Sequence, residues 1–354
     1  MKKIIYLAWM ALCSFHAYGQ TDTTFYKGAD ISWTTQLEAE GHRFYNQKGE
    51  ERECTALMKE LGLNAIRLRV WVDPEDGWSS KEDMLTLAKR AQANDMELMV
   101  DFHYSDFWAD PAHQTIPRAW QNLSFEDLKV AVATHTRDVL LLLKNSGIKP
   151  RWVQVGNETS DGFLWEVGRA STNMPQYAAL TTAGYDAVKD IFPETTVIVH
   201  LDNGFNNELY NYIFDGLKAN GGKWDMIGMS LYPYWSIMYK HVKNADEAIT
   251  RCMDNIRRMS RKYNCPVMIV ETGMESAKPE EGKAQLARII RQAVWKPKEN
   301  AGVCFIGNPN VNPLLTYWVH LLPMDTLPPL WKPLRKISEC KSLKSLFLLH
   351  SIFS

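Results

Sequence analysis

The architecture of this chain can be worked out from one stretch, RWVQVGNETS, residues 151–160. Its apolar run passes directly into Gly, Asn and Glu, which predicts a buried strand over 152–157 followed by Glu158. A carboxylate that follows a buried strand is costly unless it is paired or lies in a cleft. The stretch therefore predicts a strand that leads into a polar cavity.

The same order of strand-like run, polar loop and helical pattern recurs along the chain. The predicted strands span 26–32, 65–71, 97–104, 152–157, 196–201, 226–232 and 267–272. Examples of the helical patterns between and after them are 81–94, 127–147 and 281–294. Seven such units, with an eighth strand due near residue 302, predict an α/β fold of the (β/α)8 or TIM barrel type.

Polar residues end all seven predicted strands. They are Asp30, Arg69, His103, Asn157, His200, Tyr232 and Glu271. In a barrel the C-terminal strand ends meet at one mouth, where active sites lie, so we expect these side chains around one cavity. No Gly-x-Gly-x-x-Gly follows the first predicted strand, which weighs against the alternative of a dinucleotide-binding sheet.

Composition and charge limit the kinds of molecule that we expect the protein to bind. The formal net charge of −1 over 354 residues argues against nucleic acid or an anionic membrane as the main partner. The chain has 13 Trp and 14 Tyr, most of which we assign to core packing. Aromatic clusters such as DFHYSDFW (101–108) and SLYPYW (230–235) also suit stacking against sugar rings.

The N-terminus has the features of an export signal. Residues 1–19 carry two lysines, an apolar run and then small residues, which predicts a secretory signal peptide cleaved before Gln20. A lipoprotein anchored at Cys13 is the alternative, disfavoured because Leu12 is large for such a cleavage site. We expect a monomer, secreted or in the cell envelope, with no transmembrane segment.

Two carboxylates suggest the chemistry. Glu158 and Glu271 end the fourth and seventh predicted strands, so a barrel would project them into one cavity. Taken alone, each glutamate is explained by a carboxylate that is capped or salt-bridged at a strand end. Together they suit glycoside hydrolysis, in which one carboxyl protonates the leaving oxygen and the other attacks the sugar carbon.

Longer motifs sharpen this interpretation. GNE (156–158) and VETG (270–273) resemble the retaining glycoside hydrolases of clan A. Within that clan, four blocks resemble glycoside hydrolase family 53, the arabinogalactan endo-β-1,4-galactanases. They are GADIS (28–32), LGLNAIRLRVWVDP (61–74), DFHYSDFWADPAHQTIPRAW (101–120) and WVQVGNETSDGFLW (152–165). The resemblance covers about residues 26–293 and implies a polysaccharide substrate, the β-1,4-galactan side chains of pectin.

The resemblance also implies roles. Glu158 would be the general acid/base and Glu271 the nucleophile that forms a covalent galactosyl-enzyme. Asn157 would bind the sugar 2-hydroxyl. Tyr232 would hydrogen-bond Glu271, and Arg69 would add positive charge beneath it. Further residues would line the sugar subsites: His103, His200, Asp30, Asp106 and Trp108.

We expect no cofactor and no required metal. Some bacterial members of the family hold calcium in a long loop near the seventh or eighth strand. Residues 272–283, TGMESAKPEEGK, lack the dense Asp and Asn spacing that calcium prefers.

The C-terminal segment departs from the family. Residues 303–313 read VCFIGNPNVNP, where the family has a Tyr-Trp-Glu-Pro sequence whose Trp forms the floor of the −1 subsite. Back-translation with all synonymous codons, read from the third base, permits Val-Phe-Tyr-Trp-Glu-Pro. We therefore predict that 294–354 is a frame-shifted tail that disrupts the eighth βα unit, and that 20–293 is the catalytic barrel domain.

Two other functions stay open at this point. One is another clan A endo-glycanase, such as a mannanase or a glucanase. The other is a catalytically impaired galactan-binding homologue, because the altered C-terminus lacks the stacking Trp and is expected to weaken both stability and activity.

Overall fold

Parallel strands form a closed barrel in the structure, a computed structural model that describes residues 25–46, 48–273, 278–294 and 301–306. The order around the barrel is β1-β10-β9-β8-β7-β6-β5-β4. Their bounds are β1 Lys27–Asp30, β4 Ala65–Val70, β5 Glu97–Phe102, β6 Trp152–Val155, β7 Thr196–Leu201, β8 Met226–Leu231, β9 Val267–Thr272 and β10 Ala301–Ile306. The predicted (β/α)8 barrel is confirmed.

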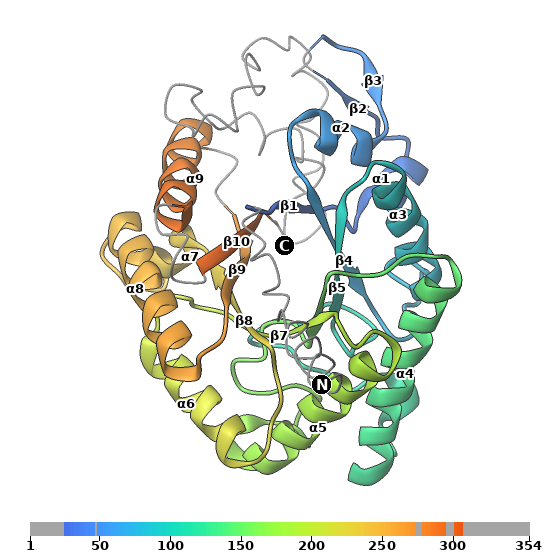
Figure 1. Cartoon of the computed structure of the whole chain (residues 1–354), viewed down its shortest axis with the longest axis vertical. Helices are drawn as coiled ribbons and strands as arrows, with labels where there is room; N and C mark the ends of the chain where they lie inside the picture. The colour runs from blue at the N-terminus through green and yellow to red at the C-terminus, as the bar shows by residue number, and fades with distance from the viewer. Residues whose placement is uncertain (1–24, 47, 274–277, 295–300, 307–354) are drawn as a thin grey trace, which may run out of the picture.

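Helices cover the outside of the barrel (Figure 1). The longer ones are α3 Lys81–Ala93, α4 Phe125–Asn145, α5 Ala170–Ile191, α6 Asn207–Ala219, α8 Ala245–Tyr263 and α9 Pro279–Val294. Shorter elements are α1 Thr34–Ala39, β2 Phe44–Tyr45, β3 Glu51–Arg52, α2 Cys54–Glu60, a 3-10 turn at Arg118–Trp120 and α7 Pro233–Met238. Within the described residues, none of the helices combines the length and the apolar character needed to cross a membrane.

Side-chain caps set the starts of several helices. The Ser80 hydroxyl accepts a hydrogen bond from the Asp83 amide at the start of α3. Ser124 does the same for Asp127 at the start of α4. Because Ser124 is the cap, α4 begins at Phe125, two residues before the start expected from its apolar pattern.

The eighth strand is present as backbone. β10 pairs in parallel with β1, where Lys27 lies opposite Cys304, and with β9, where Ala301 lies opposite Val267. Such pairing needs only main-chain amides and carbonyls, so an atypical sequence can still supply it. The rest of the predicted frame-shifted segment, 295–300 and 307–354, lies outside the described residues, as does the predicted signal peptide.

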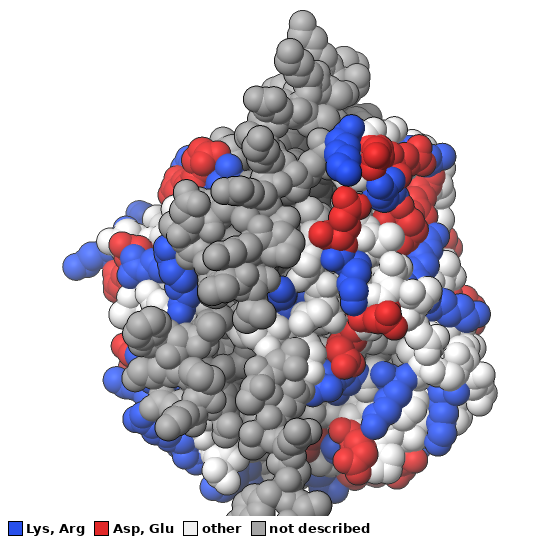
Figure 2. Space-filling view, turned by 45° about the horizontal axis from the view of Figure 1, so that its top comes forward, with Lys and Arg blue, Asp and Glu red and all other residues white. Residues whose placement is uncertain are grey.

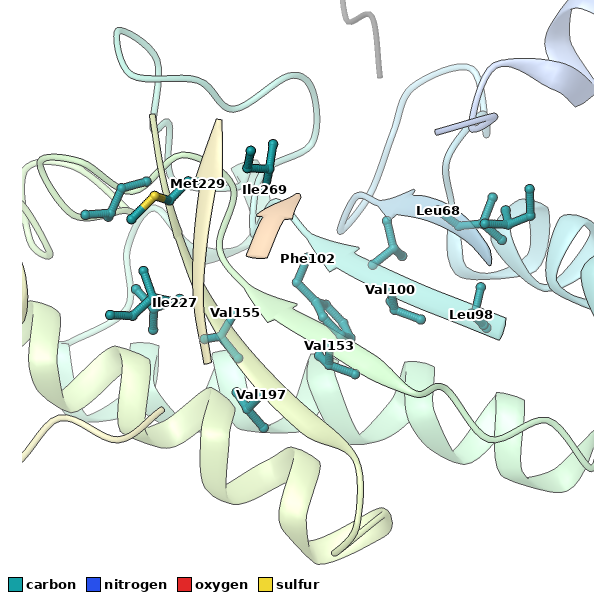
Figure 3. Packing of buried hydrophobic residues seen from close by; sticks show 14 of the residues in the cluster. Leu68, Leu98, Val100, Phe102, Val153, Val155, Val197, Ile227, Met229 and Ile269 are labelled. Atoms are coloured by element: carbon teal, nitrogen blue, oxygen red, sulfur yellow. The ribbon is translucent and has the colours of Figure 1, made fainter. Parts of the chain in front are cut away.

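Strand residues alternate between two environments. Residues on the outer face pack against the helices and form the main core (Figure 3). Examples are Leu68, Leu98, Val100, Phe102, Val153, Val155, Val197, Ile227, Met229 and Ile269. Residues on the inner face form a smaller cluster inside the barrel: Tyr26, Ala65, Met99, Trp152, Ile198, Met268 and Val270. Polar inner-face residues lie toward the C-terminal strand ends, above this apolar plug.

A β-bulge interrupts the alternation on β9. Met229 of β8 lies opposite Ile269, but the next residue, Ser230, lies opposite Glu271, so Val270 is the extra residue. Val270 belongs to the cluster inside the barrel. Regular alternation would then direct Glu271 outward, toward the helices. The bulge turns it back to the barrel interior, as bulges near active sites commonly do.

The surface carries mixed charge. Basic and acidic side chains are interspersed over the part of the face that Figure 2 shows in colour. This distribution agrees with the formal net charge of −1 and with a partner that is not strongly charged.

Two valines on α4 test the packing of helices on the barrel. Val132 is 0% exposed, whereas Val130, two residues earlier, is 63% exposed. Val132→Ala should lower the free energy of unfolding by about 2 to 3 kcal/mol, because two buried methyl groups and their contacts are lost. Val130→Ala should change it by less than about 0.5 kcal/mol. Chemical denaturation measures both, and equal losses would contradict the observed burial of this helix.

Candidate active site

One buried guanidinium, that of Arg67 on β4, lies among the polar residues of the barrel interior. Arg67 is 3% exposed and faces inward because it alternates with Ile66 and Leu68, which pack toward the helices. Its nitrogens lie 2.7–3.2 Å from side-chain oxygens of Asp30, Asp101, Gln154, Asn157 and Glu271. One cation therefore connects residues from β1, β5, β6 and β9.

The charges around Arg67 support one another. Burial works against the charge of Arg67, but Asp101, Glu271 and Asp30 raise its pKa above the ordinary value. Burial also raises the pKa of Asp101, but Arg67 and His103 outweigh burial and hold that pKa at about 2. Arg67 is therefore a permanent cation and Asp101 a permanent anion across the range in which enzymes work.

The GNE turn after β6 positions the first carboxylate. Gly156 has φ +88, and a Cβ there would lie 2.5 Å from Cγ2 of Thr159, so only glycine fits. Glu158 itself has φ +46, a left-handed conformation that non-glycine residues adopt at some cost. Thr159 anchors the turn, since its amide donates to the carbonyl of His200 at 2.8 Å. Asn157 and Glu158 are thereby held beside the cavity.

The second carboxylate, Glu271, is 4% exposed and has two strong partners. The Tyr232 hydroxyl donates to Oε1 at 2.5 Å, which is the contact expected from the family resemblance. Nη2 of Arg67 lies 3.2 Å from Oε2. Burial raises the pKa of Glu271, while the charge of Arg67 and the hydrogen bond from Tyr232 oppose that rise. Burial and the charges of Glu271 and Glu158 raise the pKa of Tyr232 well above 10, so Tyr232 stays a hydroxyl donor.

A short hydrogen-bonded chain leads from His200 to Glu158. Nδ1 of His200 lies 2.9 Å from the amide nitrogen of Gln154 and 3.3 Å from the backbone nitrogen of Glu158, so it accepts. Nε2 then carries the ring proton and donates to the Ser230 hydroxyl at 2.8 Å. Ser230 in turn hydrogen-bonds the Glu158 carboxyl. Burial and Arg67 lower the pKa of His200 well below 6.5, which keeps this ring neutral.

The two carboxyl groups face each other. One carboxylate oxygen of Glu158 and one of Glu271 lie within 4.8 Å of each other. Burial raises the pKa of Glu158 well above 4.5, and the charges of Glu271 and Asp202 raise it further. Two anions so close resist joint ionisation, so one proton is retained by the pair. Glu158 holds it, because Arg67 and Tyr232 stabilise the anion on Glu271.

Arg69 does not lie where the sequence analysis expects it. The cation against Glu271 is Arg67, which comes two residues earlier on the same inward face of β4. Two residues along a strand span about 6 to 7 Å, so Arg69 lies one level nearer the barrel mouth. There its guanidinium carbon lies 4.3 Å from the ring centre of Trp33 and 4.6 Å from that of Trp108. Burial lowers the pKa of Arg69 to about 10.

Trp108 belongs to an aromatic group near Arg69. Its ring is nearly parallel to that of Trp33, with ring centres 6.2 Å apart and an angle of 7°. His103 meets Trp108 edge-on at 5.3 Å. The Ala109 amide donates to Nδ1 of His103, so Nε2 donates to Asp101 at 2.9 Å. Burial lowers the pKa of His103, whose ring is thus fixed between the network and the tryptophans.

The remaining predicted residues, Asp30 and Asp106, lie in different surroundings from each other. Asp30 joins the Arg67 network at 2.7 Å, and its other oxygen accepts from the Ser32 hydroxyl at 2.6 Å. Asp106 does not join it. Its two oxygens accept backbone amides of Asp73 at 3.1 Å and Arg118 at 2.7 Å, so it ties two loops together.

Sequence reasoning does not single out several residues of the site, among them Arg67 with its partners Asp101 and Gln154, and also Ser230 and Asp202. Arg67 has a signal, because it shares the period-two face of AIRLRV with Arg69. Asp202 follows His200 by two residues, and burial raises its pKa to about 6. Ser230 carries no sequence signal, since its role depends on the neighbouring strand.

In the described part of the chain, one set of metal-type ligands lies close together: Glu158, His200 and Glu271, within 4.8 Å. Both ring nitrogens of His200 already have hydrogen-bond partners. The set is therefore better suited to proton transfer than to holding a resident ion. Residues 274–277 of the loop considered for calcium lie outside the described residues.

Comparisons with known proteins agree with this geometry. A model of glycosyl hydrolase family 53 matches residues 26–297. The chain is 34% identical over 261 residues to a probable arabinogalactan endo-β-1,4-galactanase A of Aspergillus terreus, with 72% of each protein covered. It is 34% identical over 256 residues to the endo-β-1,4-galactanase of Bacillus subtilis, covering 70% of this chain and 56% of that one.

A solved structure from a study of two fungal β-1,4-galactanases superposes with a TM-score of 0.75 at 26% identity. It covers 89% of this chain and 100% of the other. The resemblance inferred from the sequence motifs is thereby confirmed, and this chain belongs to glycosyl hydrolase family 53.

Proposed function

We propose that this chain is a retaining endo-β-1,4-galactanase that cleaves the β-1,4-galactan side chains of pectin. The observation that carries the proposal is the pair of carboxylates, whose oxygens lie within 4.8 Å in a family 53 barrel. Retaining enzymes hold their two carboxyl groups about 5 to 5.5 Å apart, whereas inverting enzymes leave room for a water. The substrate follows from relatives named as galactanases.

In the first half of the reaction, Glu271 attacks the anomeric carbon and forms a covalent galactosyl ester. Glu158 gives its proton to the departing glycosidic oxygen. In the second half, Glu158 takes a proton from water, and the resulting hydroxide equivalent displaces Glu271 from the sugar. The proton that Glu158 supplies is thus returned to it, and the anomeric configuration is retained.

The surroundings prepare each carboxyl for its part. Glu158 is protonated at the start because burial and the facing carboxylate raise its pKa. Glu271 is ionised because Arg67 and Tyr232 stabilise its negative charge. As charge leaves Glu271 during attack, the proton on Glu158 becomes easier to release, which suits the same step.

The side-chain amide of Asn157 is held in place by two hydrogen bonds within the protein. Its oxygen accepts from Arg67 at 2.9 Å, and its nitrogen donates to the Ala109 carbonyl at 2.8 Å. Among the described residues the second N–H of this amide has no partner, so it is left for a ligand. We assign that N–H to the 2-hydroxyl of the sugar being cleaved, a contact that strengthens in the transition state.

We also propose that the enzyme acts as a monomer outside the cytoplasm, in the cell envelope or beyond it. The signal-like residues 1–19 support export, and pectin is a polysaccharide found outside cells. N-terminal sequencing of exported protein that did not begin at Gln20 would contradict the cleavage site.

The frame-shift hypothesis remains part of this proposal. The family model matches only as far as residue 297, just before β10. A change of frame near codon 294 accounts for a family match that ends there. Sequencing of the gene decides the matter, because an uninterrupted frame with no family-like reading in another frame would contradict it.

Substitution of either carboxylate is expected to abolish most activity. On β-1,4-galactan, Glu158→Gln should lower kcat by about 10²- to 10⁴-fold and Glu271→Gln by at least about 10³-fold. Glu126→Gln is the matched control, since the Glu126 side chain is 74% exposed and pairs with Lys129 at the surface. Reducing-sugar release measures the effect. Mannan or cellulose as the better substrate of the parent protein would identify another clan A glycanase instead.

Tyr232→Phe should move the acidic limb of the pH profile to higher pH. Glu271 must be ionised to attack, and the Tyr232 hydroxyl favours that ionised form. Its loss raises the pKa of Glu271, so activity disappears at a higher pH as the solution is acidified. The expected shift in kcat/KM is on the order of one pH unit. An unchanged acidic limb would show that this hydrogen bond does not tune Glu271.

Restoring the reading frame from about codon 294 should raise both stability and turnover. The restored chain regains the Tyr-Trp-Glu-Pro sequence on the eighth strand and a helix after it. We expect a higher melting temperature and a kcat/KM on galactan larger by about tenfold or more, since a stacking Trp is regained. Equal melting temperatures and equal turnover of the two chains would refute the expectation.

A further inference from the structure

A continuous chain of hydrogen bonds runs through the barrel interior from Arg67 to Glu158. Nε of Arg67 lies 2.8 Å from Oε1 of Gln154. Nε2 of Gln154 lies 2.9 Å from Nδ1 of His200, and Nε2 of His200 lies 2.8 Å from the Ser230 hydroxyl. Ser230 hydrogen-bonds the Glu158 carboxyl. We call Arg67, Gln154, His200 and Ser230 the interior chain.

Each link of the interior chain has a fixed direction. A guanidinium has donors and no acceptor, so Arg67 must donate and the side-chain oxygen of Gln154 must face it. The NH₂ group of Gln154 then donates to Nδ1 of His200. A neutral imidazole that accepts at Nδ1 carries its proton on Nε2, so His200 donates to Ser230. The other partner of this hydroxyl among the described residues is the Glu158 carboxyl, so the hydroxyl proton is directed there.

The surroundings of Nδ1 decide which nitrogen of His200 carries the proton. Two donors face Nδ1: the Gln154 amide at 2.9 Å and the backbone nitrogen of Glu158 at 3.3 Å. One acceptor, Oδ1 of Asn157, lies 3.1 Å away, and it already accepts from Arg67 at 2.9 Å. A proton on Nδ1 would therefore leave two donors without their acceptor. Without Gln154, one donor would face one acceptor.

Burial protects these links from competition by water. Gln154 and His200 are 0% exposed, and Ser230 is 1% exposed. Hydrogen bonds in such an interior are strong, and an unpaired group there is costly. Burial and the charge of Arg67 also hold the pKa of His200 well below 6.5, so the ring stays neutral. The direction of the interior chain is thereby kept as the pH changes.

We propose that the interior chain prepares the acid of the reaction, with Gln154 and Ser230 as positioning residues that hold a hydroxyl proton against Glu158. This rests on the proposed function, in which Glu158 protonates the departing oxygen. No proton travels along the chain. The Ser230 hydroxyl stabilises the carboxylate that appears on Glu158 as the glycosidic bond breaks. Glu158 is then a stronger acid, and a stronger acid protonates the leaving oxygen faster.

One cation thus acts on both carboxyl groups. Arg67 contacts Glu271 directly, with 3.2 Å between Nη2 and Oε2. It acts on Glu158 through three neutral groups, each of which polarises the next. In the first half of the reaction negative charge leaves Glu271 and appears on Glu158. Stabilisation that reaches both groups lowers the cost of this transfer.

The other groups that face Glu158 have separate effects on its pKa. Burial, Glu271 and Asp202 raise it, whereas Arg67 lowers it. The neutral titratable groups nearby are His200, Tyr210 and Tyr232. The hydrogen bond from Ser230 also lowers the pKa of Glu158. Ser230→Ala leaves the charged groups in place, so it should raise this pKa by the share that the hydroxyl contributes.

The leaving group of the substrate tests the proposal. Ser230→Ala should lower kcat/KM on β-1,4-galactan about tenfold, because a sugar leaving group needs a proton. On a dinitrophenyl β-galactobioside, whose leaving group departs without a proton, the change should be less than about twofold. The basic limb of kcat/KM on galactan should move to higher pH by about one unit, since Glu158 keeps its proton longer. Ser230→Thr retains the hydroxyl and should restore most of both properties.

Thr195→Val is the matched control, because it also removes a buried hydroxyl. Oγ1 of Thr195 donates to the Pro150 carbonyl at 2.7 Å, just before β7 and at the opposite end of that strand from His200. This variant should lower the melting temperature and leave kcat/KM on both substrates unchanged. Equal losses on the two substrates in Ser230→Ala, with an unmoved basic limb, would overturn the proposal and leave the proposed function intact.

The proton position on His200 tests the first links without turnover. NMR of isotopically labelled histidine should show a proton on Nε2 and none on Nδ1, with the His200 signal identified by its loss in His200→Gln. In Gln154→Met, a second form with the proton on Nδ1 should appear. A proton on Nδ1 in the parent protein, or an unchanged spectrum in Gln154→Met, overturns the proposal. A folded parent protein that cleaves neither substrate removes the proposed function and the catalytic role of the chain together.

Discussion

The buried charge of Arg67 is the constraint on which the site depends. A guanidinium that has left water must find acceptors for its donors, and no single neighbour can supply them. Here they come from β1, β5, β6 and β9, so the mouth of the barrel is tied across its interior. Such a network is weak evidence of net stability, since desolvation offsets attraction. Its effect is geometric. Asn157 and Glu271 share one nitrogen of Arg67, which fixes the Asn157 amide relative to the Glu271 carboxylate.

Two local irregularities of the backbone bring the carboxylates to positions that regular strands would not give them. A regular strand would point Glu271 at the helices, and the extra residue Val270 turns it inward. A regular strand end would not present Asn157 and Glu158 together, and the left-handed turn from Gly156 to Glu158 does so. The two carboxylates thus approach each other from β6 and β9 across the cavity. Strain placed at such positions is tolerated because the surrounding packing fixes it.

Much of this was accessible from the sequence, because strand periodicity and polar strand ends are local signals. β7 and β9 have the bounds that their apolar runs predict, and the other predicted strands differ by a few residues at their ends. The depth at which a side chain lies inside the barrel cannot be predicted from the local sequence. Arg67 and Arg69 share a face, and only the register with neighbouring strands shows which of them meets Glu271. Asp106 likewise lies in an aromatic motif of the kind that binds sugars. The loop nevertheless folds so that both oxygens of the Asp106 carboxylate accept hydrogen bonds from backbone amides.

The eighth strand closes the barrel, whereas other strands supply the carboxylates of the site. β10 joins β9 to β1 through backbone pairing, which makes few demands on side chains. The carboxylates and the partners that set their protonation come instead from β4, β6, β7, β8 and β9. A change of frame near codon 294 would therefore leave both carboxylates, Glu158 and Glu271, in place. It would remove the stacking Trp that the family places beneath the sugar. Binding energy realised in the transition state would then be lost, while the groups that transfer the proton stay competent. A galactanase altered in this way would bind the sugar ring poorly at the cleavage point, although its carboxylates are correctly placed.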